Sequence, residues 1–562
     1  MGNKTSHINS MPDWRKIFAA IFLVLSVIPG MILLRMCIDL YDEPYQILNA
    51  MDSQSAPMAP LSAYAGNIFG NIFGWNQLSF RYLSYAMTQG AICLGGVWVY
   101  MRRRNASEAM TLTGCLLLAN GSMRTNAWHY SWDSLSFLLL TLTAIAFMEY
   151  CRKSSAAKVA IMAILSTLAI GSRMPDAVIV PLVAIAIIFC AQDTVPRNRR
   201  LKFVAMYLVL TAVATWVMLS LLYYSAGGFA GYLRAVNDNS ISNHSPGFLV
   251  YSFVVAVVVL YILVAFISFI LRVCKVLIDK GMSPAVSVSF TALTAIVVTF
   301  IGIFKLYNYS LPYLYEALFW TGICYLLYTQ GKRWDRDSYI FIFLALFSFV
   351  HIIGSNLHLY KNLGIYLMPI LYVLLCKHRI KVRYYVLLAV YIIPLCMLYS
   401  YSECYSPYDG IEDNDCTERI QGTVFDGIYD TPKRLNAIHL ADSTFTDIKN
   451  KGCRPVIVPA YMSNHGWIYL ACTENEKSFR HYWGFNKFKD YTSREAVKAI
   501  AQDIQKGAAK KIVLMIDILR LKAKVSLTKI CATILTARSA ANRRFRVCFV
   551  FMVRGLQSKN NE

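Results

Sequence analysis

The sequence predicts a polytopic α-helical membrane protein with about 13 transmembrane helices, interfacial helices in its first outer loop, and a small C-terminal extracytoplasmic α/β domain. Three observations predict this fold. Of the 562 residues, 57% are hydrophobic and 15% are charged, whereas a soluble domain carries roughly 25% charge. Apolar runs of about 17–22 residues recur along the chain. Lysine and arginine gather in alternate loops, the pattern that orients membrane proteins.

The formal net charge of +23 raises the question of nucleic-acid binding. The basic residues, however, cluster in short loops between apolar runs, so their distribution predicts topology and attraction to anionic membrane lipids. No nucleic-acid partner is predicted. The basic loops are 102–104, 152–153, 197–202, 272–280, 332–333 and 377–383.

The first apolar run is longer than a signal-peptide core and has no small-residue cleavage site, so we expect a retained helix. Lys4, Arg15 and Lys16 precede it and predict a cytoplasmic N-terminus. The alternation of basic loops then places the segment after Ser400 outside a bacterial inner membrane. The predicted spans are 17–37, 79–100, 107–121, 134–151, 157–171, 175–191, 203–224, 247–271, 284–304, 311–329, 337–355, 362–376 and 383–400.

The long outer loop between the first two spans contains two amphipathic stretches, Tyr45–Met51 and Pro60–Phe73. Their spacing and their aromatic residues predict short helices lying in the membrane interface. An ordinary extracytoplasmic loop is the alternative.

The composition changes at residue 401, which predicts a transmembrane domain at 1–400 and an extracytoplasmic domain at 401–562. Pro455–Val458 and Lys511–Met515 are typical of short buried strands, and Glu495–Gly507 is typical of a helix that follows a Ser/Thr cap. Because this domain is predicted to face outward, its cysteines are able to form disulfides, and Cys404–Cys416 is one candidate pair.

Acidic residues lie at the predicted outer boundary of the membrane. Asp42 and Glu43 follow the first span, and Asp133 opens the fourth. Charges at this depth are costly unless solvated, paired or used in function, and convergent carboxylates suit general-base catalysis. For Asp133 and for Asp176 in the Arg-Met-Pro-Asp segment, helix capping is the alternative.

Several basic residues break the positive-inside trend by lying at outer ends of spans. They need an anionic partner, which is either a nearby carboxylate or a phosphate; snorkelling at helix ends is the alternative. No CxxC pair or His–Cys cluster supports a zinc site, while the acids leave a divalent metal open. The predicted donor- or phosphate-binding residues are Arg81, Arg124, Arg173, Lys305, His358 and Lys361.

Together these features resemble the membrane-embedded glycosyltransferases of the C superfamily, in the branch of protein O-mannosyltransferases and lipid A aminoarabinose transferases. The likeness rests on Asp42-Glu43 with nearby Tyr45 after the first span, on the acidic residue that opens the fourth span, on a late Tyr-x-x-Pro motif that begins at Tyr366, and on the 13-span layout. Further matches are Pro60-Leu61, Phe73-Gly74 and Arg81-Tyr82-Leu83-Ser84. One departure is that residues 56–60 lack the lysine with which the aminoarabinose branch faces lipid phosphate.

The resemblance implies a polyprenyl-phosphate-linked sugar as donor and an envelope lipid, glycan or protein as acceptor. It implies that Asp42 deprotonates an acceptor hydroxyl, which attacks the anomeric carbon with inversion. Because the lysine at 56–60 is missing, other cations such as Arg173, Lys305 or Lys361 are expected to bind the donor phosphate.

Two other functions remain open at this point. A polysaccharide polymerase or ligase would use the same kind of donor. A transporter or lipid flippase would carry its polar residues near the bilayer midplane on broken helices, whereas the acids here lie at the predicted boundary.

Overall fold

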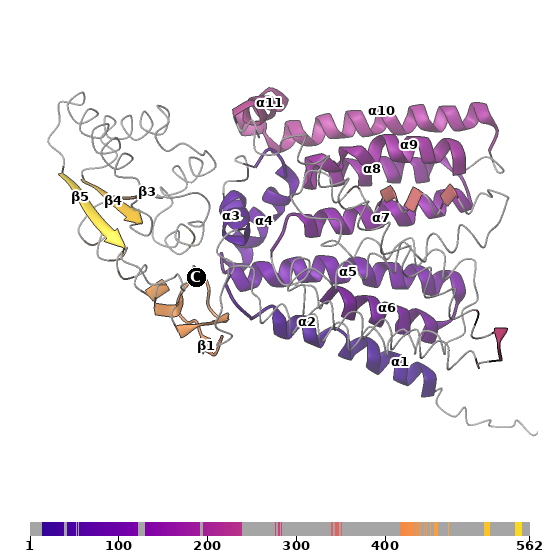
Figure 1. Cartoon of the computed structure of the whole chain (residues 1–562). Helices are drawn as coiled ribbons and strands as arrows, with labels where there is room; N and C mark the ends of the chain where they lie inside the picture. The colour runs from indigo at the N-terminus through magenta and orange to yellow at the C-terminus, as the bar shows by residue number, and fades with distance from the viewer. Residues whose placement is uncertain are drawn as a thin grey trace, which may run out of the picture.

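The computed structural model describes residues 14–38, 42–51, 53, 56–121, 130–190, 195–238 and 416–432, three strands between 454 and 552, and separate positions between 276 and 470. The described chain is mostly helical. Figure 1 shows its long helices side by side in one bundle, with α3, α4 and α11 at one end.

The first span consists of two helices, α1 (Trp14–Leu25) and α2 (Ile28–Leu33), rather than the single helix predicted over 17–37. Pro29 accounts for the break. Its ring lacks an N–H and clashes with the carbonyl of the residue four positions earlier, which is Leu25, the last residue of α1.

The next six predicted spans are helical at the expected places. The seventh begins at Arg197 instead of residue 203, because the basic residues that were assigned to the loop are good helix formers and extend the helix. Predicted spans beyond residue 238 lie outside the described residues, except for positions between 339 and 350. The helices are α5 (Gln77–Arg103), α6 (Ala106–Gly121), α7 (Asp133–Arg152), α8 (Ala156–Ser172), the 3₁₀ helix η3 (Met174–Val178) with α9 (Ile179–Cys190), α10 (Arg197–Leu222), and, after the 3₁₀ turn η4 (Tyr224–Ala226), α11 (Phe229–Asp238).

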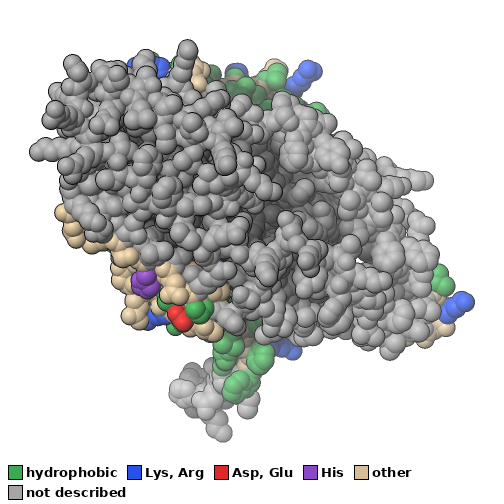
Figure 2. Space-filling model, turned by 60° about the vertical axis from the view of Figure 1, so that its left-hand side comes forward, with side chains coloured by type: hydrophobic (Ala, Val, Ile, Leu, Met, Phe, Trp, Pro, Cys, Tyr) green, Lys and Arg blue, Asp and Glu red, His purple; other side chains and the backbone are tan. Residues whose placement is uncertain are grey.

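Three described helical stretches are long and apolar enough to cross a membrane: Trp14–Leu33, Asp133–Arg152 and Arg197–Leu222. α6, α8 and the η3–α9 stretch are apolar but shorter. α10 exposes large hydrophobic side chains such as Val209 and Trp216, and hydrophobic side chains also gather on the described surface at the bottom of Figure 2. These features are consistent with a membrane protein, since apolar side chains of this size are favoured in contact with lipid.

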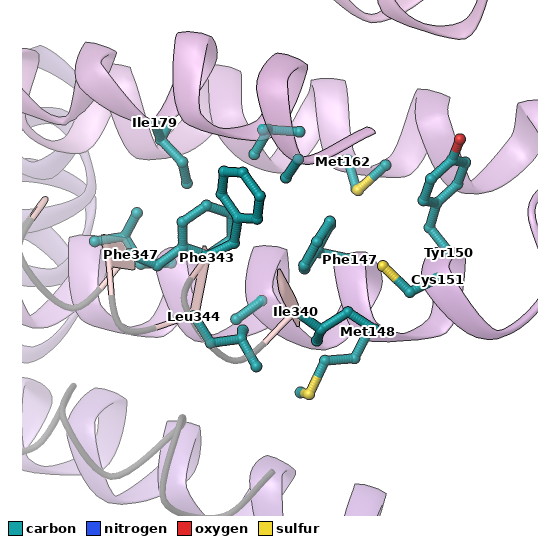
Figure 3. Packing of buried hydrophobic residues seen from close by; sticks show 14 of the residues in the cluster. Phe147, Met148, Tyr150, Cys151, Met162, Ile179, Ile340, Phe343, Leu344 and Phe347 are labelled. Atoms are coloured by element: carbon teal, nitrogen blue, oxygen red, sulfur yellow. The ribbon is translucent and has the colours of Figure 1, made fainter. Parts of the chain in front are cut away.

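The main core is built from residues of α5 to α10 and of the helical positions between 340 and 350. Phe147 and Tyr150 of α7 are fully buried, and Figure 3 shows them among residues of α8, α9 and the helical positions between 339 and 350. The rings of Phe147 and Phe347 lie 5.6 Å apart between centroids. The predicted eleventh span, 337–355, therefore packs on α7 at its described positions.

Helices α3 (Asp42–Met51) and α4 (Pro60–Phe73) occupy the two stretches for which short helices were predicted. They pack closely at Gly66 of α4. A Cβ atom on Gly66 would lie 2.5 Å from the Tyr130 hydroxyl and 2.8 Å from the Ala50 Cβ atom, so a side chain at this position would separate α4 from α3.

We expect Gly66→Ala to destabilise the protein by about 1–3 kcal/mol, because the added methyl group overpacks a buried contact. The measurement is the thermal unfolding temperature of the detergent-purified protein. Gly90→Ala is the matched control, since a Cβ on this helical glycine meets no atom within 4 Å among the described residues. Equal unfolding temperatures for the two variants would contradict the close α3–α4 packing.

The C-terminal region contains a three-stranded parallel sheet of β3 (Arg454–Val458), β4 (Lys511–Asp517) and β5 (Arg546–Met552), in the order β3-β4-β5. β3 and β4 lie where strands were predicted, whereas β5 was not predicted. After Arg546 this strand is a continuous apolar run, which is the sequence signal for it. Each parallel connection here spans many residues, as parallel pairing requires. The predicted helix at 495–507 and Cys404 lie outside the described residues.

Candidate functional site

The end of the bundle that carries α3 is built around an ion pair between Glu43 and Arg81. Arg81 Nη2 lies 2.7 Å from Glu43 Oε2, and both side chains are completely buried. Glu43 comes from the first turn of α3, and Arg81 comes from the first turns of α5. Removing two charges from water is costly unless each is fully paired and hydrogen-bonded, so the surroundings of this pair determine its task.

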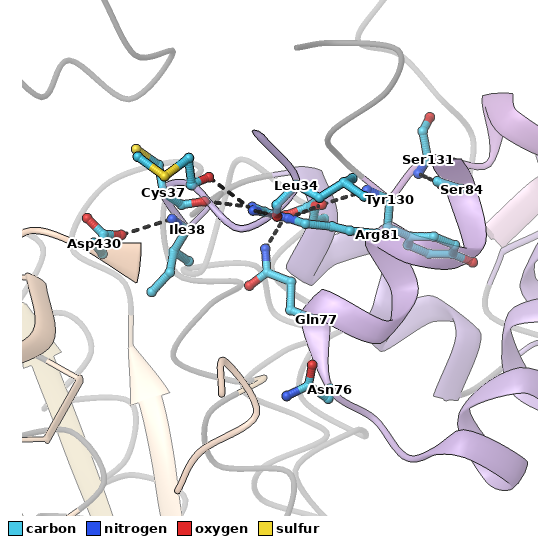
Figure 4. A network of polar contacts seen from close by, with 12 residues as sticks. Leu34, Cys37, Ile38, Asn76, Gln77, Arg81, Ser84, Tyr130, Ser131 and Asp430 are labelled. Atoms are coloured by element: carbon cyan, nitrogen blue, oxygen red, sulfur yellow. Dashed lines mark hydrogen bonds and ion pairs between the residues drawn. The ribbon is translucent and has the colours of Figure 1, made fainter. Parts of the chain in front are cut away.

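Every N–H of the Arg81 guanidinium has an acceptor. Nε donates to Glu43, and Nη2 donates to Glu43 and to the Cys37 carbonyl oxygen at 2.8 Å. Nη1 donates to the carbonyl oxygens of Leu34 and Met36. Figure 4 shows Arg81 reaching the chain at Leu34 and Cys37 in this way. Three of the five donors of the guanidinium thus hold the exit of the first span, and the other two bind Glu43.

Glu43 is also bound by other elements. It accepts hydrogen bonds from the Gln77 amide of α5 and, at 2.5 Å, from the Tyr130 peptide N–H. Tyr130 is itself buried, which raises the pKa of its phenol. Glu43 therefore joins α3 to α5 and to the segment that leads into α7.

This geometry favours a structural task for both charges. With its N–H groups directed at Glu43 and three carbonyl oxygens, Arg81 is poorly placed for the phosphate contact predicted from the sequence. Glu43, fully buried beneath it, is poorly placed for the predicted catalytic role. A phosphate role for Arg81 and a catalytic role for Glu43 stay predictions that these contacts do not favour.

The segment before α7 lies directly on α3. The Trp132 peptide N–H donates to Gln46 Oε1 at 2.6 Å, and the Trp132 ring lies 5.8 Å from the ring of Tyr45 between centroids. Tyr45, predicted as a site residue, thus contacts the residue next to Asp133. The helix that carries Asp42 and Glu43 thus contacts the residue that precedes Asp133.

A second cluster of charges lies at the adjoining ends of α7, α8 and η3. Arg173 Nε lies 3.1 Å from Asp133 Oδ1, and Arg173 Nη1 lies 3.1 Å from Asp176 Oδ1. Asp176 is fully buried and also accepts a hydrogen bond from Ser136 of α7. Asp133, with 29% of its side chain exposed, is the most accessible member of this cluster. Arg173 is therefore held between two carboxylates.

Neither aspartate occupies the N-cap position of its helix, which is held by Trp132 in α7 and by Arg173 in η3. Asp133 is the first helical residue of α7, and the Ser131 hydroxyl accepts a hydrogen bond from its peptide N–H. Asp176 lies inside η3 and bonds Ser136 and Arg173 instead of a backbone N–H. The i, i+3 spacing of Arg173 and Asp176 is a sequence signal for their ion pair. Pro175, near the start of the helix, instead favoured a capping role for Asp176.

Residues 416–432, with the described positions that follow up to 438, cover the same end of the bundle. Strands β1 (Glu418–Arg419) and β2 (Tyr429–Asp430) pair antiparallel, and β2 bonds the first span: the Cys37 N–H donates to the Tyr429 carbonyl oxygen at 2.8 Å. Buried hydrophobic residues unite this segment with α3, α5 and Tyr130 in one core. That core contains Ile38, Ile47, Leu48, Ala50, Met51, Phe80, Tyr130, Ile420, Val424, Phe425, Ile428, Ile438 and Leu470.

Other predicted site residues cannot be placed. Asp42 is the first residue of α3, but its side chain lies outside the described part of the chain. Arg124, Lys305, His358, Lys361 and Tyr366 also lie outside it. Among the residues that are described, no group of three or more histidines, cysteines or acids could hold a metal ion.

Comparison with known proteins adds little to this geometry. No family model and no curated protein matches the sequence. Among solved structures, one similar fold is the oligosaccharyltransferase of Archaeoglobus fulgidus, crystallised as a complex with Zn and sulfate. The two share 13% identity with a TM-score of 0.44, over 85% of this chain and 69% of that chain. A similarity of this size does not determine an activity.

The chemistry of the site follows from its charges. A partly exposed carboxylate on Asp133, oriented by Arg173, lies next to the helix that begins with Asp42. Such an arrangement is able to orient a hydroxyl and accept its proton. Arg173 is the cation of the Asp133–Arg173–Asp176 cluster and already pairs with both carboxyl groups, so an anionic ligand needs further cations here.

Proposed function

We propose that the chain is a membrane glycosyltransferase that moves a sugar from a polyprenyl-phosphate-linked donor to a hydroxyl on an envelope lipid, glycan or protein. The observation that carries this proposal is the Asp133 carboxylate, partly exposed and held by Arg173 beside α3. The Asp-Glu pair, the aspartate that opens the fourth span and the layout of the spans support it through their resemblance to C-superfamily glycosyltransferases.

In the proposed reaction, an acceptor hydroxyl attacks the anomeric carbon of the donor while its proton passes to Asp42. The bond from the anomeric carbon to the phosphate oxygen breaks, and polyprenyl phosphate leaves with inversion. Asp133, oriented by Arg173, binds the acceptor hydroxyl or the sugar. The charge that grows on the leaving phosphate is stabilised by cations.

We assign that last task mainly to residues beyond the described part. Arg173 already pairs with two carboxylates, so its guanidinium would be divided between them and a phosphate. Arg124, Lys305, His358 and Lys361 are the proposed additional phosphate ligands, on the basis of their predicted place at outer ends of spans.

The proposal is tested by purifying the protein in mild detergent and identifying its bound lipids by mass spectrometry. We expect a polyprenyl phosphate or its sugar-linked form, because the proposed site needs a lipid with one phosphate. Added donor should then be consumed with release of polyprenyl phosphate when a hydroxyl acceptor is present. Transfer from a nucleotide sugar by lipid-extracted protein would contradict the proposed donor.

A further inference from the structure

Two cysteines that are distant in the sequence touch at the end of the first span. The Sγ atoms of Cys37 and Cys416 lie 2.9 Å apart, although 379 positions separate the residues. Cys37 is buried and Cys416 is partly exposed. We propose that these two residues form a disulfide bond, which fastens the C-terminal segment to the exit of the first span. This pairing competes with the Cys404–Cys416 pair considered from the sequence.

The contact between the thiols is set by the backbone on both sides. The Cys37 N–H donates to the Tyr429 carbonyl oxygen of β2, and the Cys37 carbonyl oxygen accepts from Arg81. Cys37 also adopts a φ of +54°, a left-handed conformation that non-glycine residues take only when their surroundings require it. The direction of its side chain is therefore determined by the fold.

Cys416 is held close to β2 by the neighbouring strand β1. It precedes β1 by two positions, and β1 pairs with β2 through Glu418 and Asp430. The Asp430 carboxylate in turn accepts from the Ile38 N–H at 2.9 Å, a bond drawn in Figure 4. Because β2 holds both cysteine-bearing segments, closing the bond requires little movement of the backbone.

The reaction needs an oxidant, since two thiols lose two protons and two electrons when one S–S bond forms. We assign this role to a thiol–disulfide oxidase in the extracytoplasmic compartment, whose own disulfide is reduced to two thiols. The more exposed Cys416 forms the mixed disulfide, and Cys37 then displaces the oxidase. The hydrogen bond to Cys37, together with burial, raises the pKa of the Cys416 thiol.

The bond would act on the candidate site through Arg81. The Arg81 guanidinium, which donates to the Cys37 carbonyl oxygen, also holds Glu43, the neighbour of Asp42. A covalent link at Cys37 keeps residues 416–432 over this network. The disulfide concerns the covalent state of the chain alone, so its formation does not depend on sugar transfer.

The test is peptide mapping of the full-length protein from its membrane, with thiols alkylated before lysis. Trypsin and a glutamyl endopeptidase are suitable, because Glu412 separates Cys404 from Cys416 and the tryptic peptide 36–81 contains Cys37 alone. We expect a disulfide-linked pair of peptides that contains Cys37 and Cys416. This pair should be present in the unreduced digest and absent after reductant is added. Alkylated Cys37 and Cys416, or a Cys404–Cys416 link, would overturn the proposal.

Two variants distinguish Cys37 from Cys404 as the partner of Cys416. Cys404→Ser should keep the Cys37–Cys416 species, whereas Cys37→Ser should abolish it and leave Cys416 alkylated. Cys93→Ser is the control for cysteine replacement in general, since Cys93 lies exposed on α5. Loss of the linked species in Cys404→Ser would show that the native partner of Cys416 is different.

Discussion

Arg81→Met is expected to destabilise the protein by about 3–5 kcal/mol, because it leaves the Glu43 carboxylate buried without its cation. The substitution keeps a long side chain, so the loss reflects charge and hydrogen bonds more than volume. It also removes the donor shared by the carbonyl oxygens of Leu34, Met36 and Cys37. Unfolding of the detergent-purified protein, followed by heat or denaturant, measures the effect.

Arg35→Met is the matched control for this prediction. Arg35 lies close to the same chain segment but is exposed, with a hydrogen bond to the Tyr82 hydroxyl, and exposed substitutions usually change stability little. A double variant that also carries Glu43→Gln should recover part of the loss, since the uncompensated buried charge is gone. Similar stabilities for Arg81→Met and Arg35→Met would contradict a structural task for the buried pair.

Asp42→Asn is expected to lower sugar transfer by about 10²–10⁴-fold, the usual contribution of a general base. The amide keeps the size of the side chain and cannot accept the proton of an acceptor hydroxyl. Because Asp42 opens α3 while Glu43 carries the buried contacts, folding and membrane insertion should persist. Single-turnover transfer from a polyprenyl-phosphate-sugar donor measures the rate.

The control is Asp39→Asn, which removes a carboxylate from the same short segment and should leave the rate nearly unchanged. Lipid binding by Asp42→Asn is the second readout, because the donor is expected to remain bound when only the base is lost. Full activity in Asp42→Asn would remove it from the base role. An equal loss in both variants would indicate a general effect of charge in this segment.

The positions of the described helices could largely be predicted from local patterns. A run of apolar residues long enough for a span can be recognised from that stretch of sequence alone. Helices α5 to α8 begin and end within a few residues of the predicted limits. The same holds for α3 and α4 and for strands β3 and β4. Errors arose where one residue acts on the backbone, as Pro29 does between α1 and α2.

The ion-pair partners of the charged residues could not be predicted from local patterns. The sequence placed Glu43, Arg81, Asp133 and Arg173 at one boundary, but it did not distinguish a charge that is used up in packing from one that faces a ligand. Only the packing of α5 against α3 directs Arg81 at Glu43 and at three backbone carbonyls. Only the meeting of α7, α8 and η3 puts Asp133 on Arg173.

The closing of this end by residues 416–432 is likewise a property of the folded chain. Hydropathy and charge report whether a segment is lipid-facing or aqueous. They hold no information on which distant segments pair, because a backbone bond such as that from Cys37 to Tyr429 depends on complementary shape across hundreds of residues. The contact between Cys37 and Cys416 therefore emerged from the three-dimensional arrangement, while the two cysteines were visible from the start.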